Sequence, residues 1–255
     1  MAARERADQL LALRGLAESR EKAKRLVMAG QAFVIERGQK TPIAKPGQML
    51  PADAELLVEG VERFVSRGGF KLLTAIERLG LDPSGMVCLD AGASTGGFTD
   101  CLLQHGALRV YAADVGYGQL HWKLRQDPRV VVLERVNLKE PPDDLLPEPV
   151  DCITADVSFI SVTRVLQGCL RFLKPGGVAA VLVKPQFELG PGRTDKGVVR
   201  DEADRQEAVD AVLRFCSEQL GLACLGTAPA GLQGPKGNQE YLVLLKRLGS
   251  QELPE

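Results

Sequence analysis

The chain has 255 residues, of which 45% are hydrophobic and 25% charged, and its formal net charge is -1. These values are typical of a globular protein with a well-buried core, and they exclude a disordered or fibrous chain. The length predicts one large domain with a small appended module. No apolar run approaches the roughly twenty residues of a membrane span, and the polar start lacks a signal-peptide core, so we expect a cytoplasmic protein without membrane contact.

The N-terminal segment is basic although the whole chain is nearly neutral, and this asymmetry predicts a polyanionic partner for that end. Apolar residues recur at helical spacing over residues 7–13 and 19–29, and Ser19 is placed to cap the second helix. Short strands are expected at 31–35 and 54–58, with a turn around Gly38. We therefore predict a compact α+β module over residues 1–60.

A connector over residues 61–69 separates this module from a second pattern, in which strands and helices alternate from 70 to 248. Alternation of this kind predicts an α/β domain with a mostly parallel sheet, whose ligands bind beyond the carboxyl ends of the strands. The expected helices are 70–79, 97–104, 120–125, 162–173 and 202–220. The expected strands are 87–90, 110–114, 130–134, 152–156, 178–184, 223–228 and 240–246. The six cysteines show no metal-type spacing and are expected to be reduced core residues, so no metal is predicted.

A turn rich in small residues follows the apolar strand at 87–90 and opens a helix, which lets the backbone approach a ligand closely. The turn lacks the G-x-G-x-x-G spacing and any lysine for phosphates, and Asp90 would repel a pyrophosphate. A cationic ligand such as S-adenosylmethionine fits better, with Asp114 at the end of the next strand bonding ribose hydroxyls. The plainer alternative is a tight structural connection. The predicted cofactor residues are Asp90, Gly92, Ser94, Thr95, Gly96, Gly97, Phe98, Asp114, Val115 and Asn137. Asn137 is assigned to the adenine edge, although an ordinary loop asparagine is the alternative.

Several ordered motifs cover nearly the whole chain. They are Ser66–Lys71 (SRGGFK), Asp90–Asp100 (DAGASTGGFTD), Ala113–Leu120 (ADVGYGQL), Asp156–Ser161 (DVSFIS), Lys184–Glu188 (KPQFE), Lys196–Arg200 (KGVVR) and Asn238–Tyr241 (NQEY). Together they resemble the hemolysin-A-like (TlyA) ribosomal RNA methyltransferases. The N-terminal module resembles the RNA-binding domain shared by a ribosomal small-subunit protein and tyrosyl-tRNA synthetase.

The resemblance implies a Rossmann-like fold with a seven-stranded sheet, similar to the FtsJ methyltransferase, and methylation of a ribose 2'-hydroxyl in ribosomal RNA, with a cytidine as the expected nucleotide. It implies a catalytic set of Lys71, Asp156, Lys184 and Glu240. Lys184 and Asp156 each end an apolar strand at the edge where ligands bind. A neutral Lys184 could accept the hydroxyl proton, and a charged one could align the oxygen and stabilise developing negative charge; the residue types allow both.

Basic residues of the N-terminal module and the connector are expected to contact RNA phosphates, which position the RNA without specifying its sequence. They are Arg6, Arg20, Lys22, Lys24, Arg25, Arg63 and Arg67. A solvated helix face is the plainer alternative for the second-helix cations. We expect a monomer that acts on ribosomal RNA or ribosomal subunits. The competing functions are a small-molecule methyltransferase or reductase, a non-catalytic ribosome assembly factor, and a membrane-active hemolysin.

Overall fold

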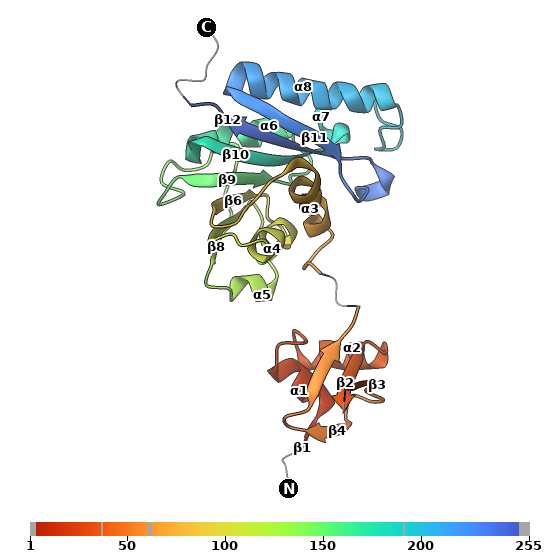
Figure 1. Cartoon of the computed structure of the whole chain (residues 1–255). Coiled ribbons are helices and arrows are strands. Elements are labelled where there is room, and N and C mark those ends of the chain that lie inside the picture. The colour runs from red at the N-terminus through yellow and green to blue at the C-terminus, as the bar shows by residue number, and fades with distance from the viewer. Residues whose placement is uncertain (1–3, 37, 61–62, 191, 250–255) are drawn as a thin grey trace. The chain divides into compact units, whose positions relative to one another are not determined.

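The protein is described by a computed structural model that covers residues 4–36, 38–60, 63–190 and 192–249. It divides into two compact units, Met1–Arg63 and Phe64–Glu255 (Figure 1). Residues 64–69, which the sequence assigned to the connector, lie in the second unit, and residues 61–62 are outside the described part. No helix of the described ranges is both long and apolar enough to cross a membrane.

The N-terminal unit packs two helices against short antiparallel strands. Its elements are β1 (Arg4–Arg6), α1 (Ala7–Leu13), α2 (Arg20–Met28), β2 (Ala32–Glu36), β3 (Gln39–Pro42), β4 (Met49–Pro51) and β5 (Glu55–Val58). Strand β2 lies between β3 and β5, and β1 pairs with β4. Ser19 accepts a hydrogen bond from the Lys22 amide at 3.2 Å, which confirms the predicted cap of α2. The sequence missed β1, β3 and β4, because three or four residues are too few to show a strand period.

The second unit is a doubly wound α/β domain. Its strands are β6 (Val87–Ala91), β7 (Arg109–Asp114), β8 (Val130–Glu134), β9 (Val150–Ala155), β10 (Leu173–Val183), β11 (Leu222–Pro229) and β12 (Tyr241–Arg247). Its helices are α3 (Gly68–Leu79), α4 (Gly97–Gln104), α5 (Trp122–Arg125), α6 (Val162–Cys169), η1 (Leu170–Phe172), α7 (Pro185–Glu188), α8 (Glu202–Leu220) and η2 (Pro235–Gly237).

The strands form a seven-stranded sheet in the order β11-β12-β10-β9-β6-β7-β8. Only β12 runs against its neighbours, which confirms the predicted mostly parallel Rossmann-like sheet. Helices α3, α4 and α5 cover one face, and α6 and α8 cover the other (Figure 1). The apolar core is therefore two layers, one on each side of the sheet, as the nearly continuous apolar runs of the inner strands require.

Two predicted boundaries in this unit were wrong by more than two residues. The helix expected over 162–173 ends in the 3-10 turn η1, and β10 begins at Leu173 with an irregularity in its pairing to β9 before Val178. The Pro175, Gly176 and Gly177 sequence hid this strand extension, since proline and glycine are poor strand residues. The short helix α7, which directly follows Lys184, was not predicted.

Candidate active site

The site lies where the strand order reverses. Strand β6 has β7 on one side and β9 on the other, and these two neighbours continue in opposite directions across the sheet. Connections that diverge in this way leave a crevice at the carboxyl ends of the strands. The crevice brings together the turn after β6, Asp114 at the end of β7, Asp156 after β9 and Lys184 after β10.

Backbone amides of the turn after β6 donate hydrogen bonds to the end of β7 and so hold the turn in place. The amide of Gly92 donates to Ala113 O at 2.8 Å, and the amide of Ser94 donates to Asp114 Oδ2 at 2.8 Å. Gly92 has a φ of 85°, and a side chain there would lie 2.9 Å from Asp156 O. Glycine is thus required by both conformation and space, because the turn crosses directly above the end of β9.

A first cavity of about 490 Å³ opens beside this turn. Three predicted cofactor residues from outside the turn, Asp114, Val115 and Asn137, line it with Gly92 and Ser94. Its remaining walls are largely apolar: Val136, Leu138, Val157, Phe159, Ile160 and Val165.

The donor set of this cavity fits S-adenosylmethionine. Apolar walls suit an adenine ring, and the Asp114 carboxylate suits ribose hydroxyls. Asp114 already accepts from the amides of Ser94 and Gly116, the latter at 2.7 Å, so its orientation is fixed before a ligand arrives. Asn137 Oδ1 accepts from the Lys139 amide at 3.2 Å, an Asx turn that leaves its amide group for a ligand.

Two residues predicted to contact the cofactor support the turn from beneath instead. The Asp90 side chain is fully buried, and its oxygens accept hydrogen bonds from Thr99 Oγ1 at 2.6 Å and Thr154 Oγ1 at 3.0 Å. Burial raises the pKa of Asp90 to about 6. A side chain at Gly96 would overlap Leu124, so this glycine is needed for packing against α5. Asp90 is not among the described residues that line either cavity, so the structure lends no support to the predicted charge contact between Asp90 and a cationic ligand.

A second cavity of about 430 Å³ adjoins the first. Both cavities are lined by Gly92, Ser94, Asp156 and Ser158, which mark their junction. The second cavity also contains the predicted turn residues Thr95, Gly97 and Phe98, together with the basic side chains Arg67, Lys71 and Lys184. A cavity with this charge suits an anionic or strongly polar molecule that accepts a methyl group, and we call it the acceptor cavity.

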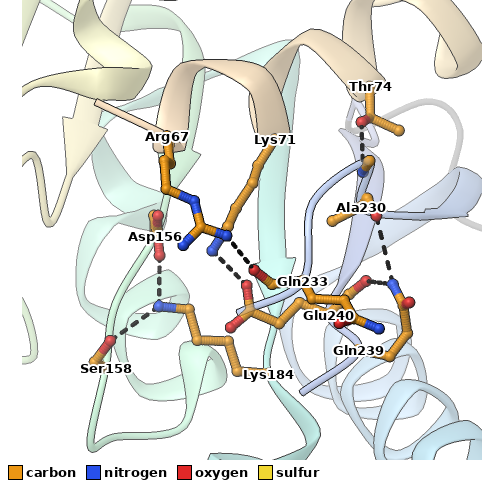
Figure 2. A network of polar contacts seen from close by, with 12 residues as sticks. Arg67, Lys71, Thr74, Asp156, Ser158, Lys184, Ala230, Gln233, Gln239 and Glu240 are labelled. Carbon is orange, nitrogen blue, oxygen red and sulfur yellow. Dashed lines mark hydrogen bonds and ion pairs between the residues drawn. The ribbon is translucent and has the colours of Figure 1, made fainter. Parts of the chain in front are cut away.

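Lys184 lines the second cavity next to the junction and is held by two partners (Figure 2). Its Nζ is 2.5 Å from Asp156 Oδ1 and donates to Ser158 Oγ at 2.9 Å. Local sequence explains its place, because Pro185 begins α7 and disfavours a helical conformation for the residue before it. Lys184 is accordingly extended, and its side chain leaves the edge of the sheet with an exposed fraction of 6%.

Lys71 and Glu240 form a buried ion pair, with Nζ 2.5 Å from Oε2, across a separation of 169 residues (Figure 2). Lys71 lies on the inner face of α3 and reaches the second cavity. Glu240 is fully buried behind it, and a side chain at Gly234 would overlap Glu240 Oε1. Three of the four predicted catalytic residues therefore line the acceptor cavity, whereas Glu240 holds one of them in place.

Helix α3 is fastened to the loop between β11 and β12 that carries Gly234. Arg67 Nη2 donates to Gln233 O at 2.9 Å, and Thr74 Oγ1 accepts from the Gly231 amide at 3.1 Å (Figure 2). Arg67, which the sequence assigned to RNA contact, thus has an intramolecular partner while its side chain still lines the acceptor cavity. These two hydrogen bonds hold α3 and the loop together, and so help to keep Lys71 next to Glu240.

The sequence missed several residues of the acceptor cavity, chiefly Ser66, Ser158, Gln233 and Gly234. Ser158 stood inside a recognised motif, and its position two residues after Asp156 was the available signal. Gln233 and Gly234 carry no such signal, because the β11–β12 loop reaches the site only through its packing on α3.

The basic residues of the N-terminal unit fall into two groups. Arg6 Nε and Arg20 Nε each lie 2.9 Å from a different oxygen of Asp8, whose side chain is fully buried. The side-chain hydrogen bond from Arg6 is the largest cause of a pKa for Asp8 lowered to about 2. Lys24 pairs with Glu21 at 2.5 Å.

Three other residues that were predicted to contact RNA differ in their surroundings. Lys22 is half-buried and Arg25 is exposed on α2, and no ion pair within 4.0 Å involves either residue in the described part of the chain. Arg63 is exposed and ends the first unit. The residues expected to contact RNA are therefore of two kinds. Arg6 and Arg20 hold the buried Asp8, and Lys22 and Arg25 belong to no ion pair in the described part of the chain.

Comparison with known proteins identifies the methyltransferase unit. The family model of the FtsJ-like methyltransferases matches residues 64–247. The chain is 44% identical to the 16S/23S rRNA (cytidine-2'-O)-methyltransferase TlyA of Mycobacterium tuberculosis, covering 96% of this chain and 91% of that protein. It is 38% identical to hemolysin A of Brachyspira hyodysenteriae, covering 93% and 98%.

A solved structure shows the same architecture. A protein named as a hemolysin, from Streptococcus thermophilus, superposes with a TM-score of 0.71 at 40% identity, covering 98% of this chain and 90% of that one.

Proposed function

The chain belongs to the FtsJ-like methyltransferases, in the family of TlyA and hemolysin A, and we propose that it methylates a ribose 2'-hydroxyl of a cytidine in ribosomal RNA. The observation that carries this proposal is the meeting of two cavities at Asp156 and Ser158, with Lys184 bound to both of these residues from the second cavity. One cavity has the lining of a cofactor site and the other is basic. A methyl donor and a hydroxyl acceptor placed in them meet beside the lysine.

S-adenosylmethionine is the cofactor, and in this proposal the first cavity holds it. Asp114 would accept hydrogen bonds from the ribose hydroxyls, and Asn137 and Val115 would hold the adenine. The turn residues Gly92 and Ser94 let the backbone pass close to the methyl-bearing end. Rigid placement of donor and acceptor supplies much of the acceleration, since it converts a bimolecular encounter into an oriented one.

When bound, the cofactor supplies a methyl group on a sulfonium sulfur, which keeps the electrons of the breaking C–S bond while the ribose oxygen forms the new C–O bond. Lys184 donates a hydrogen bond to that oxygen and so directs it in line with the methyl group. Nζ passes one of its protons to Asp156 Oδ1, which lies 2.5 Å away, and the lone pair that this leaves on Nζ accepts the hydroxyl proton as the C–O bond forms. The carboxyl group then releases the proton to solvent, because Asp156 is partly exposed.

The basic wall of the acceptor cavity and the N-terminal unit suit an RNA substrate. Lys71, fixed by Glu240, faces the phosphates that flank the acceptor ribose. Lys22, Arg25 and Arg63 contribute sequence-independent phosphate contacts. We propose that the protein acts as a monomer in the cytoplasm, with ribosomal subunits as its partners.

The test is to incubate the purified protein with S-adenosylmethionine carrying a labelled methyl group, together with ribosomal subunits or a mixture of small hydroxyl and amine metabolites. The label is expected in ribosomal RNA. Label in the small molecules alone would contradict the proposal, and so would cofactor binding without transfer to either class, which is the result for an assembly factor.

A further inference from the structure

Ser158 is the polar residue of the junction to which neither the sequence nor the family motif gave a role. It lines both cavities, and its side chain is exposed at the point where they meet. Its hydroxyl oxygen accepts from Lys184 Nζ at 2.9 Å. The serine is thus in direct contact with the lysine that the proposed reaction uses.

The contacts with Asp156 and Ser158 occupy two of the three hydrogen positions of the Lys184 ammonium group. Nζ is tetrahedral, with one bond to the side chain and three positions for hydrogens. Asp156 Oδ1 at 2.5 Å takes one position, and Ser158 Oγ at 2.9 Å takes another. Figure 2 shows the two partners diverging from Nζ. A single position is left, and Lys184 lines the acceptor cavity.

One partner alone does not fix this position. An ion pair is only weakly directional, so with Asp156 as the sole partner the torsion about the Cε–Nζ bond covers a range of angles and the directions of the other hydrogens vary with it. A second hydrogen bond narrows that range. We propose that Ser158 is a positioning residue, whose hydroxyl, together with Asp156, directs the third position of Lys184 Nζ at the acceptor oxygen. This inference rests on the proposed methyl transfer and adds a determinant of its rate.

The direction of the third Nζ hydrogen matters because the cofactor cavity adjoins the acceptor cavity. A misdirected hydrogen on Nζ would still bind the acceptor but would leave its oxygen out of line with the methyl group. Small errors of alignment lower the rate of a positioned reaction without lowering affinity. Loss of the Ser158 hydroxyl is therefore expected to affect kcat and to spare both KM values.

The experiment compares Ser158→Ala with Ser158→Thr, which keeps a hydroxyl, and with Ser217→Ala, which removes an exposed serine from α8. A hydrogen bond to a charged group predicts a decrease of about tenfold or more in kcat for Ser158→Ala. The KM for RNA and the Kd for S-adenosylmethionine should stay within about twofold of the values for the unchanged protein. Ser158→Thr should recover most of the rate, and Ser217→Ala should match the unchanged protein.

A double-mutant cycle shows whether Ser158 acts through Lys184. In single-turnover measurements, Ser158→Ala should add no further decrease to that of Lys184→Ala, because the group that it orients is already gone. An additive decrease, an unchanged kcat in Ser158→Ala, or an effect confined to KM would overturn the proposal. If the unchanged protein transfers no methyl group to RNA, the proposed function fails, which is a distinct result.

A readout without turnover completes the test. In nitrogen-15 NMR spectra of the free protein at low temperature, the held ammonium hydrogens of Lys184 should exchange slowly with water, and the signal should disappear in Lys184→Ala. Exchange should accelerate several-fold in Ser158→Ala and become slow again in Ser158→Thr. Equal exchange rates in the unchanged protein and Ser158→Ala would show that the hydroxyl does not restrain Nζ, and the inference would fall.

Discussion

We assign different roles to two side chains of the site: Asp114 binds the cofactor, and Lys184 takes part in methyl transfer. Lys184 faces the acceptor cavity, whereas Asp114 lies in the cofactor cavity and is fixed by backbone amides. We expect Lys184→Ala to lower methyl transfer by at least about a hundredfold, the range for removal of an oriented proton-transfer group, with cofactor affinity retained. Asp114→Ala should instead weaken cofactor binding. Calorimetric titration beside single-turnover transfer separates the two, and an exchange of these phenotypes would contradict the division.

The buried carboxyl group of Asp90 predicts a pH dependence of stability. Its pKa is raised to about 6, so the folded protein binds this proton more tightly than the unfolded chain. The free energy of unfolding should therefore fall as pH rises from about 4 to about 6, by at most about 3 kcal/mol, and then level off. The isosteric Asp90→Asn variant lacks this proton. Urea unfolding of both proteins across that range checks the prediction, and parallel pH curves would contradict it.

The sequence located the reactive residues along the chain but not the direction of their side chains. Lys184 and Asp156 were recognised because each ends an apolar strand, and strand ends share one edge of a parallel sheet. Asp90 also stands near a strand end. Its side chain turns beneath the sheet edge to Thr99 and Thr154, a choice fixed by strand pleat and register. Ser158 was missed for the same reason, since its contact with Lys184 depends on the loop path after β9.

At the level of elements, the turn after β6 depends on a glycine that packs against α5. Gly96 has a φ of 96°, and a side chain there would overlap Leu124 of α5. Gly96→Ala should lower the free energy of unfolding by about 2 kcal/mol or more, from strain plus overlap, and should weaken cofactor binding about tenfold as the turn is displaced.

Gly85→Ala is the matched control for this turn. Gly85 has a φ of 71° but nothing within 4 Å of the added side-chain atom, so it carries the strain without the overlap. Thermal unfolding and cofactor titration of the two variants are the measurements. Equal effects on cofactor affinity would mean that the packing of Gly96 against α5 does not shape the site.

Helix α2 carries one cation that stabilises the fold and two that we propose contact RNA. Arg20 contacts the buried Asp8, whereas neither Lys22 nor Arg25 belongs to an ion pair within the described part of the chain. We expect Lys22→Gln with Arg25→Gln to weaken binding of ribosomal RNA, and to reduce the slope of log affinity against log salt by about one for each phosphate that is no longer bound. Stability should be unchanged. Filter binding over a salt series measures the slope.

Arg20→Gln is the contrasting variant, because it removes a partner from a buried carboxylate. It should lower the stability of the N-terminal unit, seen as faster hydrogen exchange in α1 and α2 of the full chain. An unchanged salt slope in the Lys22 and Arg25 variant would assign that face of α2 to solvent instead of RNA.

Elements with strong periodic patterns were predicted well, and those made by long-range contacts were not. The bounds of α1, α4, β8 and α8 agree with prediction, because apolar spacing and terminal signals coincide in each. The strands β1 and β4 and the extension of β10 exist only through pairing with distant strands. The pairing of Lys71 with Glu240 likewise joins residues 169 positions apart.

For the whole molecule, two units divide the work of one reaction. The methyltransferase unit holds both cavities, and in our proposal the N-terminal unit presents cations to RNA phosphates, which carry no base information. Specificity for one nucleotide must then come from contacts made at the acceptor cavity and from the shape of the RNA. The account stands on one claim above the others, which is that the acceptor atom is a ribose oxygen beside Lys184.

The position of the methyl group on the modified nucleotide tests this claim most directly. Ribosomal RNA treated with the protein and labelled S-adenosylmethionine is hydrolysed with alkali, which cannot cleave the linkage after a 2'-O-methylated ribose, and the products are resolved by mass spectrometry. The account predicts label in an alkali-resistant dinucleotide that contains a methylated cytidine ribose, and disappearance of that product with Lys184→Ala. Label on the base of an alkali-released mononucleotide would contradict it.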